Sequence, residues 1–186
     1  MTLALGARLA ALALGGALLE IVAVSQVSVF GGNADLSPLL VMAAGLLCGS
    51  VAGATVGFAT GLFLDLALVQ TLGLSSLVLL AVGYWAGRLR ELRDPQGPFA
   101  PLAIGALATL GAEAGYAIVQ FLLGVDAPVS LLLLRDIIIT IAVNALLALP
   151  VYSLVRRALL PYLPADPRRR RRRAYVTGGL SPISRA

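Results

Sequence analysis

The chain has 186 residues, of which 59% are hydrophobic and 12% charged, and its mean hydropathy is +0.94. A soluble domain has too little interior to hide that much apolar surface, so the composition excludes an ordinary soluble protein and indicates an integral membrane protein. The fourteen basic residues are all arginine and histidine is absent, which removes the commonest proton shuttle and metal ligand. We therefore expect no cofactor and no metal site.

The first apolar stretch covers residues 9–30 and ends at the turn-forming sequence GGNAD, residues 31–35. At about 1.5 Å per residue it is long enough to cross about 30 Å of hydrocarbon. A cleavable signal peptide is the competing interpretation, although the segment before the stretch carries only Arg8. We predict a first transmembrane helix.

The next apolar stretch, residues 38–69, is too long for one ordinary membrane-spanning helix. Two short or tilted helices fit it better, with a turn in the glycine-containing segment 49–53. A second turn is expected at 70–73, where polar residues and a glycine interrupt the apolar sequence. The segment after it runs to Gly87 and has the length of one more crossing.

Basic residues decide the number of crossings, because they concentrate in cytoplasmic loops. The loop at 31–37 has none, whereas the loop at 88–93 has three arginines. An odd number of crossings must separate these loops, and three is the natural number. Residues 99–123 and 131–155 then form the fifth and sixth spans, so both chain ends face the cytoplasm.

Taken together, the pattern predicts an all-α integral membrane protein of about six transmembrane helices with residues 1–160 as one domain. Thirteen of its fourteen arginines fall on the cytoplasmic side, with Arg135 as the exception. Residues 161–186 form a polar, arginine-rich cytoplasmic tail that we expect to be disordered. Six consecutive cations in the tail suit anionic lipid head groups better than nucleic acid, because no interleaved aromatic residues accompany them. They are Arg168, Arg169, Arg170, Arg171, Arg172 and Arg173.

A run of glycines at every fourth position forms a strip along which another helix backbone can approach closely. Asp65 follows on the same strip, and a carboxylate within a span needs a partner to reduce its desolvation cost. Arg135 lies at a matching depth in the sixth span, so we predict that it pairs with Asp65. Asp136 is the competitor for the guanidinium. The glycines are Gly45, Gly49, Gly53, Gly57 and Gly61.

Three further polar residues fall within predicted spans: Glu20, Glu113 and Asn144. Polar groups at such depths can hydrogen-bond across helices, so one shared network is the favoured interpretation. A path for protons or a solute is the alternative.

Residues 53–90 carry a more specific signal, a GF-x-x-GL-x-x-D pattern, a glycine-containing turn at Gly73 and a span ending in Gly83-Tyr84 and Arg88. This region resembles the bacterial rod shape-determining protein MreD family, and the resemblance extends over the predicted spans to Asn144. The arginine-rich tail is longer than the family leads us to expect. The pattern residues are Gly57, Phe58, Gly61, Leu62 and Asp65.

The resemblance implies a non-catalytic subunit of the cell-elongation machinery in the bacterial cytoplasmic (inner) membrane. Its implied partners are MreC, the actin-like MreB, the glycosyltransferase RodA and a class B penicillin-binding protein. The pattern residues would shape either a groove for a partner or the fold that presents it. The family is also similar in fold to the substrate-binding S subunits of energy-coupling-factor transporters.

That similarity supplies the main alternative, a vitamin-binding S subunit. The predicted outer loops GGNADLS, VQTLG and GVDAP offer few hydrogen-bonding or stacking groups for a water-soluble ligand. An intramembrane enzyme fits less well still, because histidine is absent and Asp65 and Asp136 both lie near the predicted outer surface beside Arg135.

Overall fold

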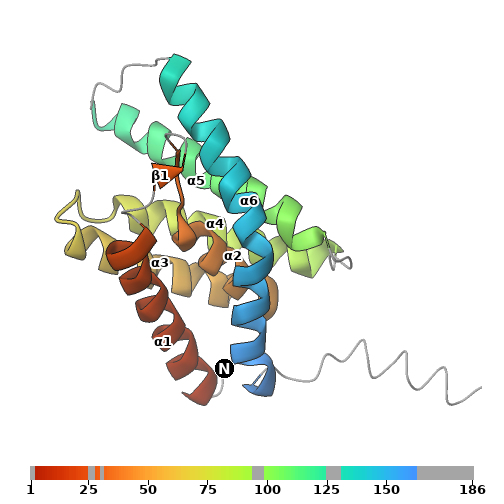
Figure 1. Ribbon diagram of the computed structural model, residues 1–186. Helices are drawn as coiled ribbons and strands as arrows, with labels where there is room; N and C mark the ends of the chain where they lie inside the picture. Colours follow the sequence, from red (N-terminus) through yellow and green to blue (C-terminus); the bar gives the residue numbers. More distant parts are fainter. Residues whose placement is uncertain (1–2, 25–27, 30–31, 94–98, 125–130, 163–186) are drawn as a thin grey trace, which may run out of the picture.

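The computed structural model describes residues 3–24, 28–29, 32–93, 99–124 and 131–162, and these form mainly α-helices (Figure 1). A short antiparallel ribbon of β1 (Ser28–Val29) and β2 (Gly32–Asn33) lies between the first two helices in the sequence. The helical elements are α1 (Leu3–Leu19), its π-helical continuation η1 (Glu20–Val24), α2 (Leu36–Cys48), α3 (Ser50–Ala67), α4 (Leu74–Arg93), α5 (Ala100–Leu122), α6 (Leu131–Leu159) and the 3₁₀ turn η2 (Leu160–Tyr162).

The helices confirm the predicted all-α class and both predicted breaks, near residue 49 and at 70–73. Four of the described helices, α1, α3, α5 and α6, are long and apolar enough to cross a membrane. Helix α2 is apolar but has only 13 residues, and α4 ends in an arginine-rich turn. The number of six spans therefore stays a prediction.

Gly49 makes the sharp break between α2 and α3. Its φ of +99° is one that residues with a Cβ rarely adopt. Its N–H still donates to the Gly45 carbonyl, which satisfies the last turn of α2. Because the chain changes direction at one glycine, α2 and α3 can both pack against α4.

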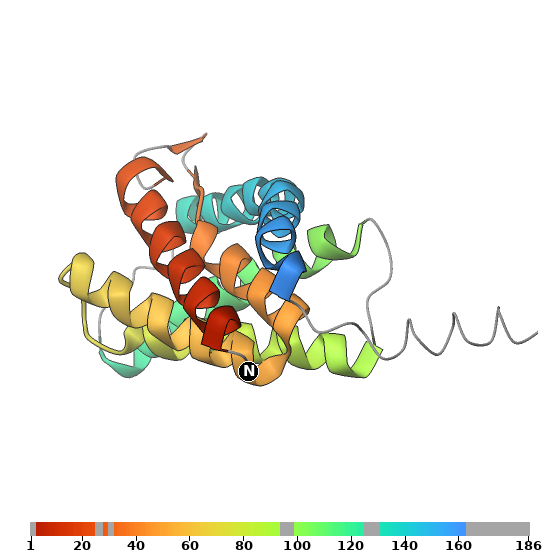
Figure 2. The same ribbon diagram turned by 90° about the horizontal axis from the view of Figure 1, so that it is seen from below.

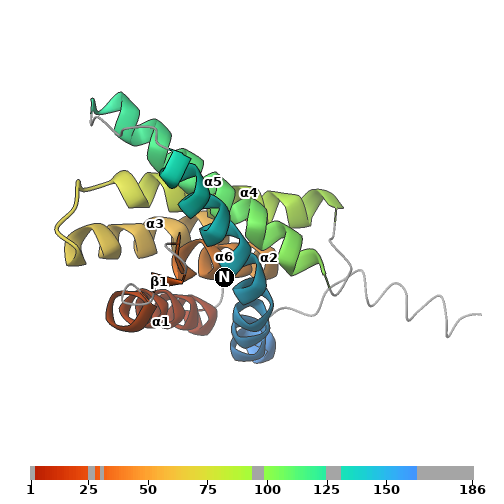
Figure 3. The ribbon, with the colours of Figure 1, turned by 45° about the horizontal axis from the view of Figure 1, so that its top comes forward.

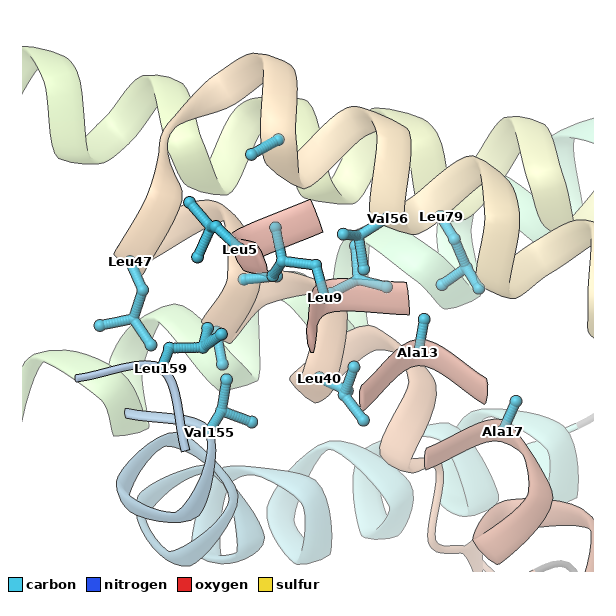
Figure 4. Packing of buried hydrophobic residues seen from close by; sticks show 14 of the residues in the cluster. Leu5, Leu9, Ala13, Ala17, Leu40, Leu47, Val56, Leu79, Val155 and Leu159 are labelled. Atoms are coloured by element: carbon cyan, nitrogen blue, oxygen red, sulfur yellow. The ribbon is translucent and has the colours of Figure 1, made fainter. Parts of the chain in front are cut away.

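Helix α2 forms the centre of the core, since every residue from Ser37 to Leu47 is buried. On one side, Leu5, Leu9, Ala13 and Ala17 repeat at every fourth position along α1 and face a cluster that includes residues of α2 and the end of α6 (Figure 4). This spacing aligns them on one helix face. On the other side, α2 packs with α4 and α5 in a second cluster.

The α3–α4 hairpin is held together by glycines. A Cβ added to Gly53 would lie 2.3 Å from the carbonyl oxygen of Gly83, and one added to Gly57 would lie 2.2 Å from that of Leu79. The two backbones can approach this closely because glycine has no side chain. The predicted glycine strip is therefore used inside the protein, between its own helices.

The helices do not share one direction. Helices α3 and α4 run side by side, whereas α1 and α6 cross their direction (Figures 1 and 2). Figure 3 shows the same hairpin beside α5. No single membrane normal can be parallel to both groups of helices, so some of them must be tilted in a bilayer.

Candidate functional site

A chain of polar contacts links η1, α2, α5 and α6. The Ser37 hydroxyl donates to the Glu20 carboxylate, and the Ser37 N–H donates to the Asp35 side chain at 3.0 Å. The Asp35 N–H donates to the Asn144 side-chain oxygen at 3.0 Å. The Asn144 amide then donates to the Thr109 hydroxyl at 3.2 Å. These bonds satisfy polar groups that would otherwise be costly to bury.

We predicted one shared network for Glu20, Glu113 and Asn144, and the observed network connects two of them. Asn144 is fully buried and joins Glu20 through Asp35 and Ser37. Glu113 is close enough to Asp35 for their charges to repel, but no hydrogen bond joins Glu113 to the network among the described residues. Asp35 and Ser37 were missed as site residues, although an aspartate just before an apolar helix is a recognisable N-cap signal.

A cleft of about 880 Å³, partly open to the surroundings, adjoins the network and shares Glu20 and Asp35 with it. Its lining is acidic, and none of the lining residues is basic. The polar lining residues come from η1, α5, the start of α2, the turn before α4 and the first turn of α4, so distant parts of the sequence build one site. They are Glu20, Asp35, Gln70, Thr71, Ser75, Glu113, Tyr116 and Gln120.

The cleft is lined by the carboxyl groups of Glu20, Asp35 and Glu113, but these are not arranged as a metal site. In the part of the chain that the structure describes, no group of three His, Cys, Asp or Glu side chains is placed to hold a metal ion. Burial and the neighbouring Glu20 carboxylate raise the pKa of Asp35 well above its usual range. A raised pKa favours the protonated Asp35 carboxyl, which can donate as well as accept, so the arrangement suits hydrogen bonding.

Asp65 does not form the predicted pair with Arg135. The fully buried Asp65 carboxylate accepts hydrogen bonds from the backbone N–H groups of Gly73 at 2.8 Å and Ser75 at 3.2 Å. It thereby caps the first turn of α4, whose N–H groups have no partner within the helix. Arg135 is exposed and Asp136 half-buried. The prediction was wrong because the backbone N–H groups of Gly73 and Ser75 already satisfy the Asp65 carboxylate, which therefore needs no cation.

The opposite end of the hairpin is held by two charged residues of α4. Arg90 was considered only as a cytoplasmic signal in the sequence, and Glu91 was missed. The Glu91 carboxylate accepts from the Ser50 N–H at 3.0 Å and from its hydroxyl at 2.7 Å, which caps α3. The Arg90 guanidinium donates to the Leu47 carbonyl at the end of α2. Both sides of the Gly49 break are therefore tied to α4.

A family model described as rod shape-determining protein MreD matches residues 8–158, which is most of the chain. The chain belongs to the MreD family. This confirms the predicted resemblance and identifies a membrane protein of a shape-determining family that is not known as a family of enzymes. Neither a curated protein nor a solved structure matches the chain.

The MreD-family motif divides into two groups in the structure. Gly57, Gly61 and Asp65 are buried and hold the α3–α4 hairpin, whereas Phe58 and Leu62 are 47% and 37% exposed. The first group serves the fold, and the second is left facing outward from α3. The six consecutive arginines predicted to meet lipid, Arg168–Arg173, lie outside the described residues.

Proposed function

We propose that this MreD-family protein is a non-catalytic, multi-pass subunit of the bacterial cell-elongation complex in the cytoplasmic (inner) membrane. It binds MreC and supports lateral peptidoglycan synthesis and the maintenance of cell shape. Its further partners are RodA, a class B penicillin-binding protein and MreB, which it contacts directly or through MreC. The family match over residues 8–158 carries this proposal.

The placement of the family motif supports a role in holding a partner helix. Because Gly57 and Gly61 are in contact with the α4 backbone, they are not free to receive another protein. Phe58 and Leu62 lie one position after each glycine and project from the outer side of α3. A transmembrane helix of MreC packed on these two side chains would use the exposed half of the motif.

Co-purification tests this proposal. The tagged protein is extracted in mild detergent, and the membrane proteins recovered with it are identified for the wild type and for Phe58→Ala/Leu62→Ala. The matched control is Leu107→Ala/Ile118→Ala, which removes two apolar side chains of α5 that are 61% and 60% exposed. Helical content and thermal unfolding of each variant show whether it still folds.

The proposal predicts that MreC and the elongation synthase are recovered with the wild type and with the α5 control. Recovery should fall by at least about tenfold for the α3 variant, as expected when an interface loses about 1.4 kcal/mol or more. Equal recovery of MreC with the wild type, the α3 variant and the α5 control would exclude the exposed face of α3 as the contact surface. Failure of the wild type to recover MreC would contradict the proposed function itself.

The acidic cleft favours a second candidate, a solute-binding subunit similar to those of energy-coupling-factor transporters. The predicted outer loops are poor in ligand-binding groups, but helices supply what the loops lack: Glu113, Tyr116 and Gln120 all come from α5. A concave site with convergent polar groups is the usual form of a small-molecule site. Its charge would select a cationic solute.

Equilibrium dialysis with a panel of radiolabelled water-soluble vitamins tests this alternative. The comparison is between the wild type and Glu113→Gln, which removes one cleft charge without a change in size. Saturable binding of a cationic vitamin that weakens in the variant would favour the transporter function. The same panel gives no saturable binding if the protein acts as a structural subunit.

A further inference from the structure

Two carboxyl groups meet at Ser37, where the chain returns from the end of the first helix to the start of α2. The Glu20 carboxylate accepts from the Ser37 hydroxyl, and the Asp35 carboxylate accepts from the Ser37 N–H at 3.0 Å. The two carboxyl groups also hydrogen-bond to each other. Because an ionised carboxylate can only accept hydrogen bonds, this direct contact needs one proton between the two groups. A single negative charge is then shared by both residues.

In the described part of the chain, no cation lines the cleft beside this pair. Asp65 is engaged by backbone N–H groups, Arg135 is exposed, and Arg8 lies twelve positions before Glu20, about 18 Å along the helix. The pair therefore has no neighbouring cation to take the place of its proton. The titratable and charged side chains toward this end of the surrounding elements are Asp65 of α3, Glu113 and Tyr116 of α5, and Arg135 and Asp136 of α6.

A change of helix type places Glu20 at this contact. Helix α1 ends at Leu19, and Glu20 is the first residue of the π-helical segment η1. A π-helical turn has wider hydrogen-bonded rings than an α-helical turn, so the side chains after it project at a different rotation about the axis. Such turns are rare and occur frequently at functional sites. The irregular turn coincides with one of the two residues that share the proton.

The end of α1 that leads into η1 has few large side chains with which to hold α2. Its buried residues are Ala13 and Ala17, whereas the opposite end of the helix buries Leu5 and Leu9 (Figure 4). Apolar packing stabilises in proportion to the area removed from water, and alanine buries little area. The polar contact of Glu20 with the start of α2 therefore contributes a large share of the attachment at this end.

We propose that Glu20 and Asp35 form a proton-binding latch, which holds η1 on α2 while the shared proton is bound and releases η1 when the proton is lost. Loss of the proton to water through the open side of the cleft leaves two adjacent carboxylates. These repel each other, because both groups are half-buried and none of the described lining residues is basic. Movement of η1 then widens the cleft, since both residues form part of its wall.

The latch closes at low pH and opens as pH rises. Burial and the neighbouring Glu20 raise the pKa of Asp35, so the pair keeps its proton at pH values where a free aspartate is already ionised. This inference goes beyond the proposed function and does not depend on its partners, because every group of the latch belongs to this chain.

Double electron–electron resonance measures the movement of η1. Spin labels are attached at Val22→Cys in η1 and Ile118→Cys in α5, at side chains that are 73% and 60% exposed. The native cysteine is removed by Cys48→Ala. The full chain is reconstituted in lipid nanodiscs and measured between pH of about 4 and about 9. Infrared spectroscopy of the unlabelled protein follows the carbonyl band of protonated carboxyl groups, which reports the proton itself.

Two amide variants and a matched control separate the pair from other carboxyl groups. In Glu20→Gln the amide can donate to the Asp35 carboxylate, so the contact no longer needs a shared proton. Asp35→Asn makes the same change on the other member of the pair, which keeps the test valid if one variant fails to fold. The control, Asp136→Asn, makes a carboxyl-to-amide change at a half-buried side chain of α6 outside the pair.

The proposal predicts that the distance between the labels lengthens as pH rises and that a component of the protonated-carboxyl band is lost over the same pH range. Each amide variant should keep the short distance at every pH and lack this component, whereas Asp136→Asn should match the wild type. A distance that does not change with pH in the wild type would overturn the latch. So would a change that persists in both amide variants, because another group would then hold the proton.

Discussion

The Asp65 carboxylate accepts a hydrogen bond of 2.8 Å from the backbone N–H of Gly73. Gly73 has a φ of +95°, so the chain turns sharply there and brings the start of α4 back to the end of α3. The second carboxylate oxygen of Asp65 accepts from Ser75. A single buried side chain thus closes the hairpin at the end that carries the cleft.

We expect Asp65→Ala to destabilise the protein by about 2–4 kcal/mol, because the N–H groups of Gly73 and the buried Ser75 lose their acceptor and α4 loses its cap. Asp65→Asn keeps one acceptor oxygen and should cost less. Thermal unfolding in detergent, followed by circular dichroism, measures the difference. Arg135→Gln is the control and should have little effect, since Arg135 is exposed. Rescue of an Asp65→Arg protein by Arg135→Asp would contradict this account.

Gly57→Ala should prevent correct packing of the hairpin. The new Cβ would lie 2.2 Å from the Leu79 carbonyl oxygen, so α3 and α4 would have to separate and lose packing along the hairpin. We expect a loss of about 3 kcal/mol or more, seen as poor accumulation in membranes and a lower unfolding temperature. Gly111→Ala is the matched control, because nothing lies within 4 Å of its Cβ. It should be neutral or stabilising, and similar losses in both variants would contradict the packing argument.

Glu91→Ala should loosen the break between α2 and α3, because Ser50 loses the acceptor for both its N–H and its hydroxyl. We expect a lower unfolding temperature and faster hydrogen exchange in the first turn of α3. Glu91→Gln retains an acceptor oxygen and should preserve most of the stability. Arg88→Gln removes the exposed ion pair with Glu91 and should change little. If it destabilised as much as Glu91→Ala, the ion pair rather than the cap would hold the break.

Stability should depend on pH through Asp35. Its pKa is raised in the folded protein, so the folded state holds a proton that the unfolded state releases near its ordinary pKa of about 4. The free energy of unfolding should therefore fall as pH rises from about 4 to the raised folded-state value. Asp35→Asn can still cap α2 and should flatten this dependence. Unfolding temperatures across that pH range test it, and an unchanged slope in the variant would exclude Asp35 as the group responsible.

Local patterns in the sequence predicted most helices and both breaks, but the bounds of the first helix were wrong. The predicted span 9–30 is instead α1 and η1, from Leu3 to Val24, and β1 at Ser28–Val29 lies within its predicted end. The apolar stretches fix where helices form, Gly49 and Gly73 fix where the chain turns, and the four-residue glycine spacing fixes a face for close contact. These features follow from backbone conformation and from the periodicity of one helix. They do not depend on which segments later meet.

The partners of the polar groups, by contrast, depend on which segments of the chain meet in the folded protein. The sequence places Asp65 and Arg135 at matching depths, yet depth along two helices does not give the rotation of each helix about its axis. Only the packing of α3 on α4 decided that Asp65 faces a turn and that Gly57 and Gly61 are used internally while Phe58 and Leu62 remain outside.

The sequence by itself determined that the chain is an apolar, helical membrane protein of the MreD family, because composition, hydrophobic length and a local motif carry that information. The tertiary structure alone decided the acidic cleft, the Asp35–Asn144 contact and the two caps of the hairpin. Each of these joins residues far apart in the chain or on opposite sides of a turn. Their geometry is set by how whole helices pack, and no local pattern encodes it.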